Sequence, residues 1–60
     1  MTPADFRATR ERAGLTAGAL AAWLGVTPRA VFLWEAGDRG ISGPVARLMG
    51  LLARFGPAPP

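Results

Sequence analysis

The sequence of 60 residues contains no cysteine, histidine, tyrosine, lysine, asparagine or glutamine. The absence of cysteine excludes disulfide bonds and thiolate metal sites, and the absence of histidine removes the other common ligand of transition metals. We therefore expect no metal and no other cofactor. No segment alternates between apolar and polar residues with a period of two, so strands are not expected either.

Groups suited to catalysis are also scarce. The single serine, Ser42, stands where a helix cap is expected, and neither cysteine nor histidine is present to act as nucleophile or general base. The four carboxylates show no pairing around a recognisable pocket, and no glycine-rich phosphate-binding loop is present. The sequence therefore argues against an enzyme.

All seven basic residues are arginine, and against four acidic residues they give a net charge of +3. This modest excess of positive charge suits a polyanionic partner such as nucleic acid. A GC-rich coding bias would also replace lysine by arginine, and composition alone leaves both explanations open.

Long hydrophobic segments are missing as well. No apolar run reaches the ~18 residues of a membrane span. The opening residues MTPADF have an early proline and a charge in place of the apolar core of a signal peptide. We expect a cytoplasmic protein that does not enter a membrane.

Helix caps and glycine stops divide the chain into four helices. A hydroxyl residue precedes each expected helix, at Thr2, Thr16, Thr27 and Ser42, and a glycine follows each one. The expected helices span residues 3–13, 17–24, 28–36 and 43–55. They make one small all-α domain, residues 1–56, followed by a flexible tail at residues 57–60.

Hydrophobic periodicity predicts which side of each helix faces the core. The inner face of the second helix holds Leu20, Ala21 and Leu24, and that of the third holds Ala30, Val31 and Trp34. In the fourth helix the expected stripe is Val45, Leu48, Leu52 and Phe55, with Met49 beside it. The outer face of the third helix then carries Arg29, Phe32, Leu33 and Ala36.

One arginine falls on an apolar face. Phe6, Arg10 and Ala13 lie together on one side of the first helix, so the guanidinium needs a partner there. Glu35, at the edge of the inner face of the third helix, is the best candidate, and two separately solvated charges are the alternative. The other arginines of the first and last helices are expected to be solvated, with Arg7 and Arg12 as weak candidates for a phosphate contact.

The spacing Ala21-x3-Gly25-x5-Val31-x2-Trp34-Glu35-x-Gly37 favours two short helices that cross steeply through a tight turn. The segments GLT (14–16), LAAWLGVT (20–27) and VFLWEAG (31–37) resemble the Cro/C1-type (XRE-like) helix-turn-helix family over about residues 6–55. The resemblance implies a compact lambda-repressor-like bundle of four helices, with a five-helix form as the alternative. It also implies an internal ion pair between Arg10 and Glu35, and a DNA-binding transcriptional regulator from a bacterium or phage.

In that family the helix at residues 28–36 enters the major groove of double-stranded DNA as the recognition helix. The resemblance makes seven residues candidates for contact with DNA: Ala17, Thr27, Pro28, Arg29, Phe32, Leu33 and Arg39. Arg29 is the only long polar side chain on the outer face and suits a bidentate pair with guanine. Ala17 stands where the family commonly carries glutamine, so only its backbone N–H remains for a phosphate. Thr27 and Arg39 are weaker candidates for the DNA backbone.

The apolar pair Phe32 and Leu33 leaves three interpretations open. The two side chains can contact thymine methyl groups, dock another protein or a second copy of the chain, or be incidental surface residues. Two functions follow from these interpretations. The first is a sequence-specific regulator that binds DNA as a homodimer through the last helix, around Leu51 and Phe55. The second is a helix-turn-helix scaffold with weakened DNA binding, whose outer face binds a protein partner or assembles copies of the chain.

Overall fold

A computed structural model describes residues 1–57 of the chain. Within that range it contains four α-helices and no strand: α1 (Pro3–Arg12), α2 (Ala17–Leu24), α3 (Pro28–Ala36) and α4 (Gly43–Phe55). The all-α architecture predicted from the sequence is confirmed, and the described residues adopt its four-helix form. The flexible tail expected at residues 57–60 lies outside the described residues, except for Pro57.

Each of these helices begins at a hydroxyl side chain that caps it. Thr2 Oγ1 accepts a hydrogen bond from the backbone N–H three residues further on at 3.0 Å, and Thr27 Oγ1 does the same at 3.2 Å. Thr16 and Ser42 cap α2 and α4 in the same way. Such a cap stabilises a helix by about 1 kcal/mol, because it satisfies an N–H group that has no partner inside the helix. Local sequence therefore sets where the helices begin.

The helix ends follow the glycines, with one small difference from the prediction. Gly25 and Gly37 close α2 and α3 in the left-handed conformation, at φ of 76° and 80°. Glycine adopts this conformation without the steric cost that a Cβ atom imposes. α1 ends at Arg12, one residue earlier than expected, because Ala13 already serves as its C-terminal cap.

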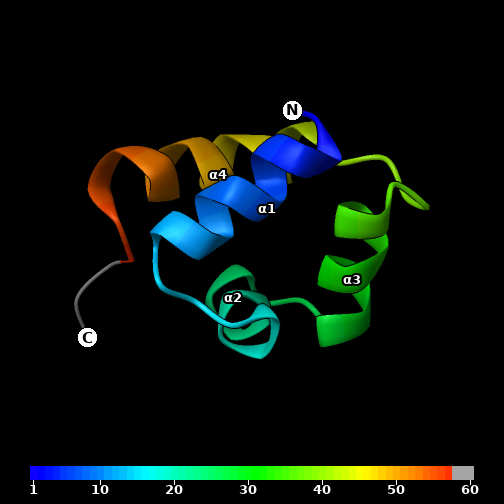
Figure 1. Ribbon diagram of the computed structural model, residues 1–60, viewed down its shortest axis with the longest axis horizontal. Coiled ribbons are helices and arrows are strands. Elements are labelled where there is room, and N and C mark those ends of the chain that lie inside the picture. Colours follow the sequence, from blue (N-terminus) through cyan, green and yellow to red (C-terminus); the bar gives the residue numbers. More distant parts are fainter. Residues whose placement is uncertain (58–60) are drawn as a thin grey trace.

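The helices pack as one side-by-side pair that runs in the same direction, α1 and α4, and one bent pair, α2 and α3 (Figure 1). Figure 1 shows α1 and α4 side by side along the long axis of the molecule, with α3 standing across one end of them and α2 beneath α1. The chain bends by 111° between α2 and α3. Among the described residues no single helix is long and apolar enough to cross a membrane; by length and composition, α2 and α3 meet that test only as this bent pair.

The core lies where the four helices meet. Its buried side chains are Phe6, Leu20, Ala21, Ala30, Val31, Trp34, Met49 and Leu52. The rings of Phe6 and Trp34 are 5.7 Å apart between centroids and tilted by 53°, an arrangement that aromatic pairs favour. The predicted inner face of α3 is confirmed in full, and that of α2 is confirmed at Leu20 and Ala21, while Leu24 is only partly buried.

The predicted inner face of α4 is partly wrong. Met49 and Leu52 are fully buried, but Leu48 is 38% exposed and Phe55 is 72% exposed. The buried side of α4 instead follows Val45, Met49 and Leu52, which are four and then three residues apart. Leu48, Leu51 and Phe55 fall on the adjoining flank of the helix and form an exposed line that we term the α4 apolar row.

Candidate nucleic-acid interface

The turn between α2 and α3 fixes the direction of α3. After α2 the N–H groups of Gly25 and Val26 donate to the carbonyls of Ala22 and Ala21, at 3.3 and 2.9 Å. Ala21 is 1% exposed, so a small side chain sits where the two helices approach each other. The resulting bend of 111° lies within the ~90–120° that separates the two helices of a helix-turn-helix motif.

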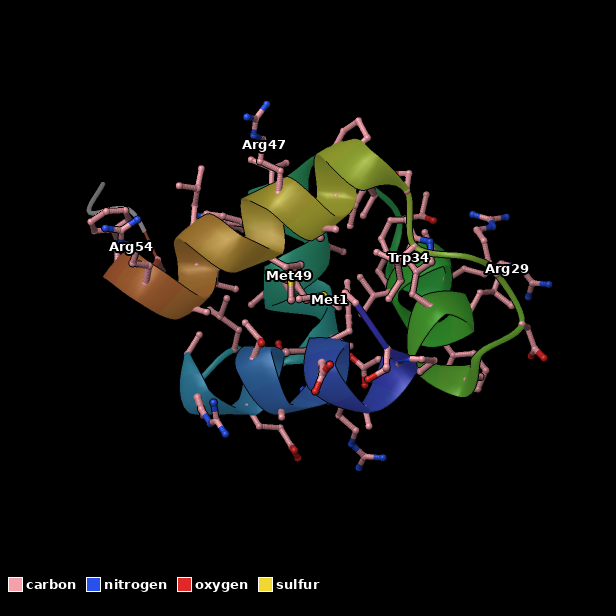
Figure 2. All side chains as sticks on the ribbon, turned by 90° about the horizontal axis from the view of Figure 1, so that it is seen from above. Met1, Arg29, Trp34, Arg47, Met49 and Arg54 are labelled. Atoms are coloured by element: carbon pink, nitrogen blue, oxygen red, sulfur yellow. The ribbon has the colours of Figure 1, made fainter. Side chains whose placement is uncertain are left out.

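The inner face of α3 is held on the core by apolar contacts. Val31 is completely buried, and Ala30 and Trp34 are 7% and 6% exposed. Figure 2 shows Trp34 pointing inward, toward the region where α1 and α4 lie. These contacts leave only the opposite side of α3 free to meet another molecule.

An ion pair between Arg10 and Glu35 also holds the edge of α3 against α1. Arg10 Nε donates to Glu35 Oε2 at 2.6 Å, and Arg10 Nη2 donates to Glu35 Oε1 at 3.1 Å. Arg10 Nη1 also donates to the carbonyl of Leu15 at 3.0 Å, so one guanidinium joins α1, the segment before α2, and α3. The side chains of Arg10 and Glu35 are 15% and 14% exposed. The structure thus brings together the two side chains that periodicity and the family resemblance paired.

The electrostatics of this pair favour the charged form of Arg10. The hydrogen bond to Glu35 raises the pKa of Arg10 above its ordinary value, and burial opposes this shift only in part. Because arginine is already protonated at any ordinary pH, the guanidinium stays a cation throughout. Arg10 and Glu35 are therefore committed to the fold and do not remain available for a ligand.

The outer face of α3 presents one cation among apolar groups. Arg29 is exposed in the first turn, Phe32 is 67% exposed and Ala36 is exposed, while Leu33 is partly buried. Figure 2 shows Arg29 projecting from one end of the molecule, far from Arg54 at the other end. The outer face can therefore donate hydrogen bonds only through Arg29 and otherwise offers apolar contact.

The start of α3 adds two further predicted contact residues. Thr27 and Pro28 are both exposed immediately before Arg29. The hydroxyl oxygen of Thr27 accepts the capping hydrogen bond, and its own proton remains able to donate to an acceptor outside the protein. The structure thus groups Thr27, Pro28, Arg29 and Phe32 at one surface.

A shallow hollow between α1, α2 and α3 connects Ala17 to this surface. Ala17 and Phe32 both line the hollow, together with Arg7. Ala17 is the first residue of α2, and its side chain is partly buried. Arg7 forms an ion pair with Glu11 at 3.8 Å, and both of these side chains are largely exposed. Sequence reasoning ranks Arg7 as a weak candidate, although its place three residues before Arg10 puts it on the same side of α1.

The loop after α3 carries Arg39 at a different place from Arg29. The N–H groups of Asp38 and Arg39 both donate to the carbonyl of Leu33, at 3.0 and 3.3 Å. These bonds hold the loop against the last turn of α3, whereas Arg29 lies in the first turn. Arg39 therefore flanks the outer face at its far end, beside the opposite charge of Asp38.

Comparison with known proteins agrees with this geometry. A family model described as "Helix-turn-helix domain" matches residues 4–58, a range that holds nearly all of the four helices. No curated protein and no solved structure matches the chain significantly. Within residues 1–57 no group of three or more acidic side chains is placed to hold a metal ion.

Proposed function

The chain belongs to the helix-turn-helix domain family, and from this premise we propose that it is a sequence-specific DNA-binding transcriptional regulator with α3 as its recognition helix. The observation that carries the proposal is the position of Arg29 in the first turn of α3, on the side opposite Trp34. Helix-turn-helix proteins place the N-terminal residues of the second helix against base edges in the major groove. We assign the chain no enzymatic activity, and we place it in the cytoplasm of a bacterium or in a phage-encoded setting.

Base recognition is assigned to the outer face of α3. Arg29 forms a bidentate hydrogen-bonded pair with guanine, a contact that discriminates by about 1–3 kcal/mol. Phe32 and Leu33 contact the methyl groups of thymine, and Pro28 adds apolar contact at the groove edge. A bidentate pair with adenine is excluded, because the chain has neither asparagine nor glutamine.

Contacts with the DNA backbone are assigned to the flanks of this face. The N–H of Ala17 at the start of α2 meets a phosphate, where the helix dipole also favours negative charge. The Thr27 hydroxyl and the Arg39 guanidinium add two further phosphate contacts. Such contacts fix the orientation of the protein on the duplex without reading its sequence.

A homodimer is required for useful affinity. The chain measures 31 Å along its longest axis, and two half-sites one helical turn apart are about 34 Å apart between centres. One copy therefore does not reach both half-sites. Because α4 runs along the long axis and α3 stands across one end of it, two copies joined side by side with their α4 helices parallel present both α3 helices at the same end (Figure 1). The α4 apolar row supplies the surface, with Leu51 and Phe55 exposed on it.

A second candidate function rests on the same outer face. Phe32 is 67% exposed, and Arg29 is the one basic residue of α3. In a scaffold with weakened DNA binding, Phe32 and Leu33 dock a protein partner or a second copy of the chain. The two functions differ in which apolar surface holds copies together: the α4 apolar row in the regulator, and the outer face of α3 in the scaffold.

The proposal is tested by selection from a pool of random DNA duplexes. The regulator enriches a two-fold symmetric sequence with a fixed guanine in each half-site. The scaffold enriches no sequence, and its affinity for enriched and starting pools is the same. A sequence enriched without a fixed guanine would remove the role given to Arg29 but keep the DNA-binding function.

A further inference from the structure

Arg29 and Phe32 are neighbours on the outer face of α3, where both side chains can contact the edges of bases. They are three residues apart, so their Cβ atoms lie about 5–6 Å apart on neighbouring turns of one face. Neighbouring base pairs are separated by about 3.4 Å along the duplex. A guanidinium and a ring spaced in this way can reach adjacent base pairs. Both side chains are exposed, so neither must leave the core to do so.

The ring of Phe32 can recognise only one kind of group in the major groove. It has no conventional hydrogen-bond donor or acceptor, so it makes at most weak contacts with the oxygen, nitrogen and amino groups of the base edges. The methyl group on C5 of thymine is the one apolar group that these edges present. Methyl on C5 of cytosine occupies the same position in the groove. Phe32 therefore detects the methyl group itself, whichever pyrimidine carries it.

The other side chains near Phe32 do not separate thymine from cytosine. In the major groove cytosine presents an amino group where thymine presents an oxygen, and a protein recognises that amino group through an acceptor such as a carboxylate. Glu35, the only acid on α3, has both carboxylate oxygens bonded to Arg10. Asp38 lies beyond the last turn of the helix, at the end opposite Arg29. Neither carboxylate is placed to select the amino group beside the guanine.

We propose that Phe32 makes recognition depend on a C5-methylated pyrimidine next to the guanine bound by Arg29, so that thymine and 5-methylcytosine are both accepted at that place. The proposal rests on the DNA-binding function proposed above and adds the class of base that the half-site takes. It makes binding sensitive to cytosine methylation, because methylation of an adjoining cytosine creates the contact that thymine otherwise provides.

Four duplexes test the proposal. They carry the selected half-sites and differ only at the pyrimidine next to the guanine, which is thymine, uracil, 5-methylcytosine or cytosine. Thymine and uracil differ by the methyl group alone, and so do 5-methylcytosine and cytosine. We expect the protein to bind each methylated duplex about fourfold more tightly per half-site than its unmethylated counterpart. This factor corresponds to ~0.8 kcal/mol, the free energy of burying about one methylene-sized group.

Three variants identify the residue responsible. In Phe32→Ala both ratios fall to about one, and in Phe32→Leu, which stays apolar, they are partly retained. Arg47→Ala is the control: it truncates an exposed side chain on α4 that points away from the core and leaves both ratios unchanged (Figure 2). Circular dichroism confirms that each variant keeps the helical content of the parent chain.

The outcomes separate this proposal from the function on which it rests. Equal binding of thymine and uracil by the parent chain overturns it, as do weaker binding of 5-methylcytosine than of cytosine and ratios that survive in Phe32→Ala. A selected site with no pyrimidine beside the guanine overturns it as well. In each of these cases the protein still binds DNA. Failure to bind any duplex, by contrast, overturns the DNA-binding function and this proposal together.

Discussion

Arg10 and Glu35 are 25 residues apart in the sequence, and their side chains meet through two hydrogen bonds of 2.6 and 3.1 Å. This pair ties the last turn of α1 to the last turn of α3. Together with the Phe6–Trp34 contact it gives α3 two attachments to α1, one ionic and one aromatic. The orientation of the outer face of α3, and hence any contact it makes, depends on both attachments.

Breaking the ion pair from one side should destabilise the fold. Arg10→Ala leaves the carboxylate of Glu35 largely buried without its partner, which costs about 3 kcal/mol in the free energy of unfolding. The double substitution Arg10→Met with Glu35→Leu removes both charges and should lie close to the parent chain. Urea denaturation followed by circular dichroism measures both, and a single variant within ~0.5 kcal/mol of the parent would show that the pair contributes nothing.

The ion pair should not make stability depend on pH in the ordinary range. The pKa of Arg10 is raised in the folded chain, chiefly by its hydrogen bond to Glu35. A raised pKa stabilises the fold fully below the unfolded pKa and loses that stabilisation only as pH rises through the folded value. Both values lie far above neutrality. Denaturation curves of Arg10→Met and the parent chain between pH 7 and 9 should therefore keep a constant separation, and a separation that shrinks across this range would contradict the assignment.

The two tryptophans should differ in their importance for stability. Trp34 is 6% exposed and packs on Phe6, so Trp34→Ala should cost about 3–5 kcal/mol and unfold most of so small a domain. Trp23 is only partly buried at the edge of the core, and Trp23→Ala should cost clearly less. Thermal melts of the two variants make the comparison. Equal losses would mean that α3 is not held on the core as described.

Removal of Arg29 should relax sequence recognition at a single position. Arg29→Ala should lose the preference for guanine in each half-site, a loss of about 1–3 kcal/mol, and keep the remaining preferences. Arg47→Ala is the matched control, because Arg47 is an exposed arginine that points away from the core on α4 (Figure 2). It removes the same charge and should leave specificity unaltered. If the two variants select identical sequences, Arg29 does not read a base.

Two pairs of apolar residues compete as the surface that joins copies of the chain. Leu51→Ser with Phe55→Ser should convert a dimer to a monomer, because it removes two exposed members of the α4 apolar row. Phe32→Ser with Leu33→Gln should leave the mass unchanged. Analytical ultracentrifugation without DNA compares the two double variants. Dispersal of the oligomer by the second pair alone would favour the scaffold over the regulator.

Much of the fold follows from local signals in the sequence. Hydroxyl caps and left-handed glycines mark helix ends through hydrogen bonds that span only a few residues. The sequence alone therefore predicts where the helices begin and end. The inner face of α3 is equally clear, because Ala30, Val31 and Trp34 are the residues that periodicity groups together. The pairing of Arg10 with Glu35 follows from the same periodicity, since it places a cation where only a partner makes burial tolerable.

The rest depends on how helices cross, which local signals do not fix. The large apolar residues of α4 occupy nearly half of its circumference, from Met49 past Val45 round to Leu51. Periodicity therefore cannot tell which part of this arc meets α1, and it predicts a core position for Leu48 and Phe55 although both are exposed. The hollow lined by Arg7 and Phe32 is beyond sequence reasoning for the same reason, because it exists only through the relative placement of three helices.

The most direct test of α3 as a DNA-reading helix is the salt dependence of binding to the selected duplex and to a scrambled duplex of equal length. The logarithm of the association constant should fall linearly with the logarithm of salt concentration, with a slope of about −0.9 for each phosphate contacted. We predict a slope that corresponds to several phosphates, together with tighter binding to the selected duplex at every salt concentration. Equal affinity for the two duplexes, or binding that salt does not weaken, would contradict the account.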